Sequence, residues 1–246
     1  MISWDEAGSG PPAVFVHGNT EDRHSWDAVW PHVTQTFRCI RLDLRGHGES
    51  GDAADYSALA MAEDVATVVA EAGVDDPPLL VGHSLGAVVV TAYASQAPAR
   101  AVVNVDQSLA FGAFGAAIQP LKDMLRGDGF ADALAAVFAG LGVEALPPDA
   151  REWADAKHAA ARKEVVLGTW DLVLDTPVAD LDALAATMLP AVTVPYLAIH
   201  GSEPDPGYET WLTSLMPSAT VEVWPGNGHY PHIVEAERFA RRIAEL

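Results

Sequence analysis

Residues 82–86 read Gly82-His83-Ser84-Leu85-Gly86, a G-x-S-x-G pattern within a chain of 246 residues. It stands between a short apolar run at 79–81, typical of a buried strand, and an apolar segment of helical length at 85–96. A serine on such a strand-to-helix turn needs small neighbours, because the strained backbone leaves little room for side chains. The pattern predicts that Ser84 is a nucleophile and that the Leu85 N–H, at a helix start, stabilises an oxyanion. A turn whose serine only caps the helix is the alternative.

The residues around this turn alternate between strand and helix patterns. A helix is expected at 55–73, where apolar residues recur on one face, and another at 234–246. Six short apolar runs are expected to form strands: residues 13–17, 37–42, 79–81, 101–105, 194–200 and 220–224. Strands that are apolar almost throughout and alternate with helices predict an α/β fold, with a mostly parallel central sheet and helices on both faces.

The middle of the chain has a different pattern. Residues 111–190 show no strand pattern and several helical stretches separated by glycine and proline, including one expected helix at 149–168. We therefore expect residues 1–110 and 191–246 to form the core. Residues 111–190 are expected to form an all-helical insertion of the kind that covers an active site as a lid.

Three further motifs follow predicted strands. They are His17-Gly18-Asn19, Asp43-Leu44-Arg45-Gly46-His47-Gly48-Glu49-Ser50, and Gly226-Asn227-Gly228-His229. Together with the G-x-S-x-G turn, and in this order, they make residues 14–246 resemble the α/β-hydrolase fold superfamily. The resemblance implies this fold, a catalytic serine with a histidine and a carboxylate, and no cofactor. It also implies that Asn19, with Leu85, lends a main-chain N–H to the oxyanion.

A serine hydroxyl is a weak nucleophile unless a base lies within hydrogen-bond reach. The sequence has nine histidines, and only His229 follows the last strand on a glycine-flanked turn, so it is the preferred base. His232, three residues later, is the next candidate. The resemblance implies that His17 and His83 brace the backbone.

The carboxylate that orients the base has three candidates. In the family the acid usually stands three residues after a glycine that ends a strand, but here Pro204 stands three residues after Gly201. Asp205 is one position late and Glu203 one early. Some family members place the acid after the strand that precedes the lid, where this chain has Asp106. We prefer Asp106, then Asp205, then Glu203; a capping or hinge role for Asp106 is the alternative.

Aromatic side chains near the predicted oxyanion loop and in the insertion are candidates for an apolar substrate pocket. The candidates are Trp26, Phe111, Phe114, Trp153 and Trp170. The alternative is that these side chains pack the helices of the lid against one another.

The charge balance narrows the class of partner. Fourteen basic against 34 acidic side chains give a net charge of −20, which argues against nucleic acid and anionic membranes as partners. The same charge favours a neutral, partly apolar small molecule over an anionic substrate. There is no signal-peptide pattern, no membrane span, and no cluster of Cys and His with metal spacing, so a cytoplasmic protein without a metal is expected.

These observations predict a serine hydrolase that cleaves a small neutral ester, lactone or related acyl compound through an acyl-enzyme. Cofactor-free perhydrolase, C–C hydrolase or lyase chemistry on the same three residues is an alternative. A member of this fold that binds a small ligand without catalysis is another, because fold does not imply function.

Overall fold

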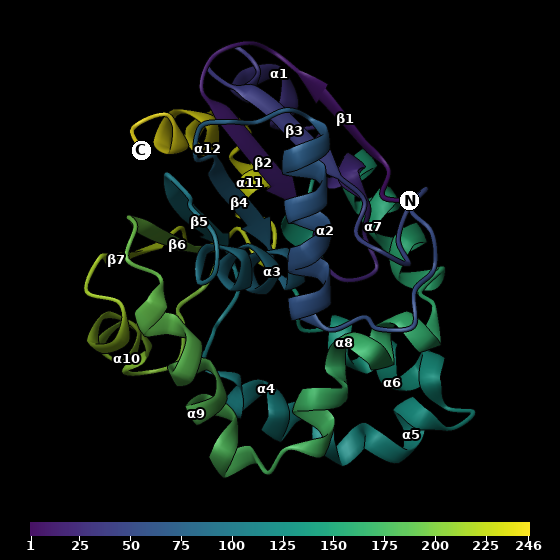
Figure 1. The fold of residues 1–246 in the computed structure, drawn as a ribbon. Helices are drawn as coiled ribbons and strands as arrows, with labels where there is room; N and C mark the ends of the chain where they lie inside the picture. Colours follow the sequence, from purple (N-terminus) through teal and green to yellow (C-terminus); the bar gives the residue numbers. More distant parts are fainter.

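The computed structural model describes residues 1–246, which fold around a seven-stranded sheet (Figure 1). The strands are β1 (Trp4–Ala7), β2 (Pro12–Val16), β3 (Arg38–Leu42), β4 (Leu79–His83), β5 (Ala101–Val105), β6 (Tyr196–His200) and β7 (Ala219–Val223). Their order in the sheet is β1-β3-β2-β4-β5-β6-β7, and β1 alone runs antiparallel to its neighbour. The predicted fold class, a mostly parallel sheet with helices on both faces, is confirmed.

The register of the strands places the site. Val16 of β2 pairs with Gly82 of β4, and His83 at the end of β4 pairs with Val105 at the end of β5. Because parallel strands end at the same edge of a sheet, the turns that follow β2, β4 and β5 lie next to one another.

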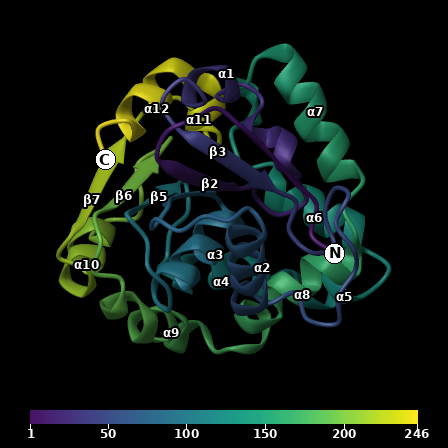
Figure 2. The same cartoon turned by 45° about the horizontal axis from the view of Figure 1, so that its top comes forward.

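Helices cover both faces of the sheet. On one face lie α2 (Ala58–Glu71), α3 (Leu85–Ala94) and α10 (Tyr208–Leu215). On the other face lie α1 (Trp30–Val33) and α12 (Ala236–Ile243), with the short α11 (Pro231–Val234) preceding α12 (Figure 2). The long helix α2 begins after Ser57, whose hydroxyl accepts the Ala60 N–H.

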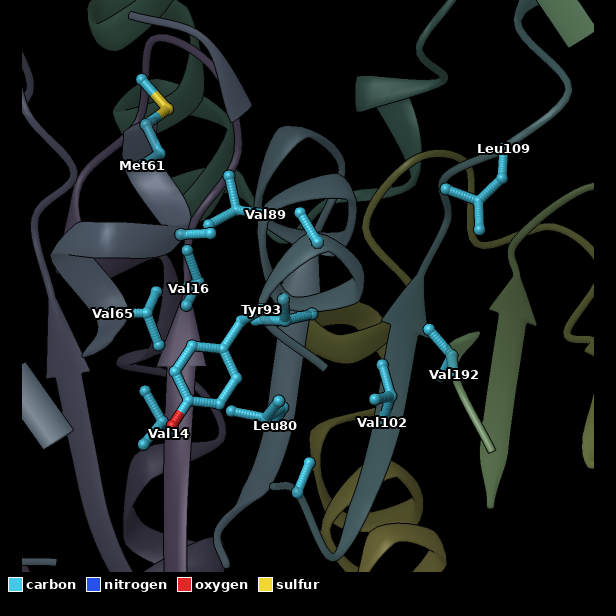
Figure 3. Close-up of a cluster of buried hydrophobic side chains, with 14 of the residues drawn as sticks. Val14, Val16, Met61, Val65, Leu80, Val89, Tyr93, Val102, Leu109 and Val192 are labelled. Carbon is cyan, nitrogen blue, oxygen red and sulfur yellow. The ribbon is translucent and has the colours of Figure 1, made fainter. Parts of the chain in front are cut away.

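Alternate residues of each buried strand supply the two cores, because successive side chains point to opposite faces. Figure 3 shows Val14 of β2 and Leu80 of β4 beside Tyr93 of α3, in the same buried core as Val102 of β5 and Met61 of α2. The intervening side chains pack on the other face, in a core that includes Phe15, Val81, Val103 and Phe239.

Six helices separate β5 from β6 and form a group beside the sheet (Figure 1). They are α4 (Phe111–Ile118), α5 (Lys122–Arg126), α6 (Phe130–Phe138), α7 (Pro148–Ala159), α8 (Lys163–Asp175) and α9 (Val178–Met188). This insertion has an apolar core of its own. No helix combines the length and the apolar character needed to cross a bilayer.

Two local predictions were wrong. The helix expected at 149–168 is divided into α7 and α8, because the backbone is extended at Arg162, with φ −91° and ψ 119°. The strand β1 was not predicted; its four residues include Asp5 and Glu6, and it pairs only with β3 at the edge of the sheet.

Candidate active site

Ser84 occupies the turn between β4 and α3 with φ 51° and ψ −121°, a strained conformation for a residue other than glycine. The two glycines of the pattern make this turn possible. A Cβ on Gly82 would lie 2.3 Å from the Gly86 carbonyl oxygen, and one on Gly86 would lie 2.1 Å from the Val16 oxygen. Glycine at both positions therefore lets α3 begin directly against the end of β2, with Ser84 half-buried between them.

Asp106 and His229 form a hydrogen-bonded pair at the same edge of the sheet. Asp106 is the residue after β5, and its Oδ2 accepts a hydrogen bond from His229 Nδ1 at 2.7 Å. Its Oδ1 accepts the Gly201 N–H, also at 2.7 Å. Because an ionised carboxylate only accepts, Nδ1 carries a proton, which leaves Nε2 as the ring nitrogen that can accept one from Ser84.

The Asp106 carboxyl is held in its ionised form. Burial alone would raise its pKa, but the hydrogen bond and charge of His229 outweigh burial, and the Gly201 N–H adds to them. The pKa of Asp106 therefore lies below its usual value. The other two candidate acids differ: Asp205 and Glu203 are exposed and make no hydrogen bond with His229.

Asn19 lies in the loop after β2, and both polar atoms of its side-chain amide form hydrogen bonds. Its Nδ2 donates to Thr169 Oγ1 at 2.9 Å, and its Oδ1 accepts the Thr20 N–H at 3.0 Å. Leu85 is the first residue of α3, where a main-chain N–H has no partner within the helix. The close approach of Gly86 to the end of β2 brings the Asn19 loop and the start of α3 together.

His17 and His83 both contact main chain. The Nε2 of His17 accepts the Leu44 N–H at 3.0 Å, and its Nδ1 lies 2.7 Å from the Gly18 oxygen. Burial lowers the pKa of His17, so the ring is neutral, with its proton on Nδ1. His83 Nε2 lies 2.8 Å from the His229 main-chain oxygen, and the two rings lie side by side with 4.6 Å between centroids and planes tilted by 54°.

His232, the second candidate base, lies in the core instead. It is fully buried, and neither of its ring nitrogens has a hydrogen-bond partner. Burial lowers its pKa well below the usual value, so the ring stays neutral.

The predicted pocket residues lie in packed regions. The structure contradicts the pocket position predicted for Trp26. This side chain is fully buried on the sheet face opposite α2 and α3, with 5.3 Å between the centroids of its ring and the Phe15 ring. Phe114 and Trp170 pack edge to face in the core of the insertion, with 5.5 Å between their ring centroids. Phe111 packs between that core and the sheet, and Trp153 packs beside the buried Tyr230.

Two cavities are lined by residues of the insertion, and one of them borders the His229 turn. One, of about 400 Å³, lies between α6 and α7 and is lined mostly by apolar side chains, among them Leu134, Phe138 and Val143, with His158 at its wall. The other, of about 420 Å³, is more polar and is bordered by Asp106 and His229. None of the five predicted pocket residues lines either cavity.

Three residues at the site were not singled out from the sequence. Glu21 is buried under the Asn19 loop and accepts the Gly18 N–H at 2.9 Å. Thr169 of α8 holds the Asn19 side chain, and the Leu141 oxygen accepts the His229 N–H at 2.8 Å. No motif marks these positions, because each acts through a contact that folding creates. No group of three or more His, Cys, Asp or Glu side chains is arranged to hold a metal ion.

Comparison with known proteins decides the family. The sequence profile of the alpha/beta hydrolase family matches residues 13–242, which is nearly the whole chain. The chain belongs to the alpha/beta hydrolase family. This agrees with the resemblance drawn from the four motifs.

The individual relatives are similar over different lengths. A pimeloyl-[acyl-carrier protein] methyl ester esterase of Methylococcus capsulatus is 42% identical over 94 residues, which are 38% of this chain and 35% of that protein. The chain spans about a third or less of the length of the curated relatives that it matches.

Two solved structures match over almost the whole chain. A thermophilic esterase from Thermogutta terrifontis has a TM-score of 0.78 at 23% identity, covering 99% of this chain and 92% of that chain. Est816, described as an N-acyl homoserine lactone degrading enzyme, has a TM-score of 0.71 at 23% identity, covering 100% and 96%. At these identities the likeness establishes the fold.

Proposed function

We propose that this alpha/beta hydrolase is a serine hydrolase that cleaves a small neutral ester or lactone through an acyl-enzyme on Ser84, His229 and Asp106. The observation that carries the proposal is the 2.7 Å hydrogen bond from His229 Nδ1 to Asp106 Oδ2, beside the strained turn that holds Ser84. This bond fixes the tautomer in which His229 Nε2 can accept the serine proton.

The reaction follows from these roles. Ser84 Oγ attacks the carbonyl carbon while its proton passes to His229 Nε2, and Asp106 stabilises the imidazolium that forms. The bond from the carbonyl carbon to the leaving oxygen then breaks, and His229 returns the proton to the departing alcohol. Water, deprotonated by His229, next attacks the acyl-enzyme; the bond to Ser84 Oγ then breaks, His229 returns the proton to Oγ, and the carboxylic acid leaves.

The negative charge on the tetrahedral oxygen needs donors that are already in position. The proposed donors are the main-chain N–H groups of Asn19 and Leu85. Their placement is supported by the tied Asn19 side chain and by the contact of Gly86 with the end of β2. Removal of one such donor costs about 2.7–4 kcal/mol of transition-state stabilisation in other serine hydrolases.

The substrate class rests on charge, cavity chemistry and relatives. A net charge of −20 repels anionic substrates, so a neutral acyl compound is favoured. The mostly apolar cavity between α6 and α7 suits a hydrocarbon or aryl group. The compared proteins are named as a methyl ester esterase, an esterase and an N-acyl homoserine lactone degrading enzyme.

We further propose that residues 111–190 act as a lid. Three of its contacts reach the loops of the site: Thr169 to Asn19, the Leu141 oxygen to the His229 N–H, and an ion pair from Lys157 to Asp22. An insertion that holds both the oxyanion loop and the base can exclude water from the reaction when it is closed.

The function is tested by turnover of p-nitrophenyl acetate, p-nitrophenyl butyrate and a set of neutral lactones by the wild-type protein and by Ser84→Ala. We expect saturable hydrolysis by the wild type and none above background by the variant. Saturable binding of these compounds without turnover by the wild type would instead identify a non-catalytic ligand-binding member of the family.

A further inference from the structure

A buried acid and a buried histidine lie between three of the loops that form the site. Glu21 is 3% exposed and His83 is fully buried, and Glu21 Oε2 lies 3.1 Å from His83 Nδ1. The same Oε2 accepts the Gly18 N–H of the oxyanion loop at 2.9 Å. The other ring nitrogen of His83, Nε2, lies 2.8 Å from the main-chain oxygen of His229.

The partners of His83 determine how many protons its ring carries. The His229 carbonyl can only accept a hydrogen bond, so Nε2 of His83 must donate. On the other side of the ring, Glu21 Oε2 also accepts the Gly18 N–H, and the lowered pKa of Glu21 keeps its carboxyl ionised; an ionised carboxylate cannot donate, so Nδ1 donates as well. A ring that donates from both nitrogens is an imidazolium, and the pair is therefore a buried ion pair.

The charges of the pair agree with this count. Burial alone would raise the pKa of Glu21 and lower that of His83, but their mutual attraction and hydrogen bond outweigh burial. The pKa of Glu21 therefore lies far below its usual value, and that of His83 lies above its usual value. Three rings surround the His83 ring: those of His229, Tyr230 and the neutral His232, whose centroids lie 4.6, 5.0 and 4.7 Å from that of His83.

A buried ion pair adds little net stability, because desolvation of both charges offsets most of their attraction. What distinguishes this pair is the main chain that it holds. We propose that the Glu21–His83 ion pair positions the catalytic groups: Glu21 holds the loop that presents the Asn19 N–H, and the charged His83 holds the main chain of His229. This inference rests on the proposed hydrolase function, and it assigns Glu21 and His83 as positioning residues.

The substitution Glu21→Gln removes the negative charge of residue 21 with little change in the shape of the side chain. The amide oxygen can still accept the Gly18 N–H, but without the carboxylate charge the buried His83 ring keeps one proton. Only one of its two ring nitrogens then donates, and the contact with either residue 21 or the His229 oxygen is lost. We expect kcat to fall about tenfold to a hundredfold, the scale of a small misplacement of catalytic groups, with KM within about threefold of wild type.

A matched control is Asp64→Asn. Asp64 of α2 is also a buried carboxylate, 6% exposed; it makes two hydrogen bonds of 2.7 Å to Arg45 and none to Asn19, Ser84 or His229. The variant Asp64→Asn loses a charge pair, that with Arg45, as Glu21→Gln loses the pair with His83, and we expect its kcat to stay within about twofold of wild type. Glu21→Asp keeps the charge and should recover part of the kcat that Glu21→Gln loses.

The charge state is read independently by ¹⁵N NMR of the histidine rings in the wild-type protein. Both nitrogens of His83 should carry a proton at pH 7, in a signal that is missing from Glu21→Gln. A singly protonated His83 ring at pH 7 would overturn the inference, even if Glu21→Gln did not fold. Equal kcat for Glu21→Gln and Asp64→Asn would also overturn it while leaving the hydrolase function intact, whereas a wild type without any turnover would remove that function itself.

Discussion

Replacement of Asp106 by asparagine tests the proposed triad with little change of shape. The introduced amide could still accept the Gly201 N–H through its Oδ1, a contact of 2.7 Å in the wild type. Its Nδ2 would then face His229 Nδ1, where the wild type has a carboxylate oxygen at 2.7 Å. Because two N–H groups cannot face each other, the His229 ring would adopt the tautomer with its proton on Nε2, which cannot accept a proton from Ser84.

The expected loss is about 10⁴-fold in kcat, the value found for the same substitution in a serine protease triad. At about 1.36 kcal/mol for each factor of ten, this corresponds to about 5 kcal/mol of transition-state stabilisation. The assay is kcat and KM for p-nitrophenyl acetate, and the matched control is Asp205→Asn. Asp205 is exposed and makes no bond to His229, so its variant should stay within about twofold of wild type. A rate within about threefold of wild type for Asp106→Asn, or a large loss for Asp205→Asn, would refute the assignment.

Three further predictions concern the turn, the pH dependence and the cavity. Gly86→Ala should destabilise the fold by about 1–3 kcal/mol in urea unfolding, because its Cβ would meet the Val16 oxygen. Gly51→Ala, whose Cβ would have no contact closer than 3.7 Å, is the control, and equal effects would contradict the reasoning. Burial lowers the pKa of His47 to about 3 in the folded protein, whereas the pKa of this side chain is about 6.5 in the unfolded chain. Between pH 3 and 6.5 the unfolded chain therefore binds a proton at His47 that the folded protein does not bind. Unfolding free energy should therefore fall as pH drops through this range, and His47→Gln should reduce that slope by up to about 1.4 kcal/mol per pH unit; an unchanged slope would contradict it. Ala135→Phe, in the wall of the cavity between α6 and α7, should lower the preference for butyrate over acetate esters by about tenfold, whereas an unchanged ratio would exclude the cavity from the substrate path.

The fold could be predicted because its determinants are local in the sequence. Gly82 and Gly86 mark the turn through steric demands that act within a few residues, and apolar runs such as 101–105 mark strands that are buried on both faces. The edge strand β1 carries no such pattern. Its residues Asp5 and Glu6 lie at the rim of the sheet, and only the pairing with β3 makes Trp4–Ala7 a strand.

The arrangement of the candidate site depends on contacts between distant segments, which sequence patterns record poorly. Asp106 and Asp205 both follow predicted strands. Only Asp106 hydrogen-bonds to His229, and the sequence does not reveal this contact because the two residues are 123 positions apart. The sequence favours a pocket position for Trp26 because it follows the predicted oxyanion loop, yet η1 (Arg23–Trp26) directs its side chain into the core on the opposite sheet face. No sequence pattern marks Glu21 in the same loop, because its partner His83 is 62 residues away along the chain.

The central claim is that Ser84 is a nucleophile activated by His229. The most direct measurement is labelling of the native protein with a fluorophosphonate, followed by mass spectrometry of the peptide that contains Ser84. We predict one phosphonyl group per chain, attached to Ser84, with no labelling of Ser84→Ala and slow labelling of His229→Gln. An unlabelled Ser84 in the wild type, or labelling that continues in Ser84→Ala, would contradict the claim.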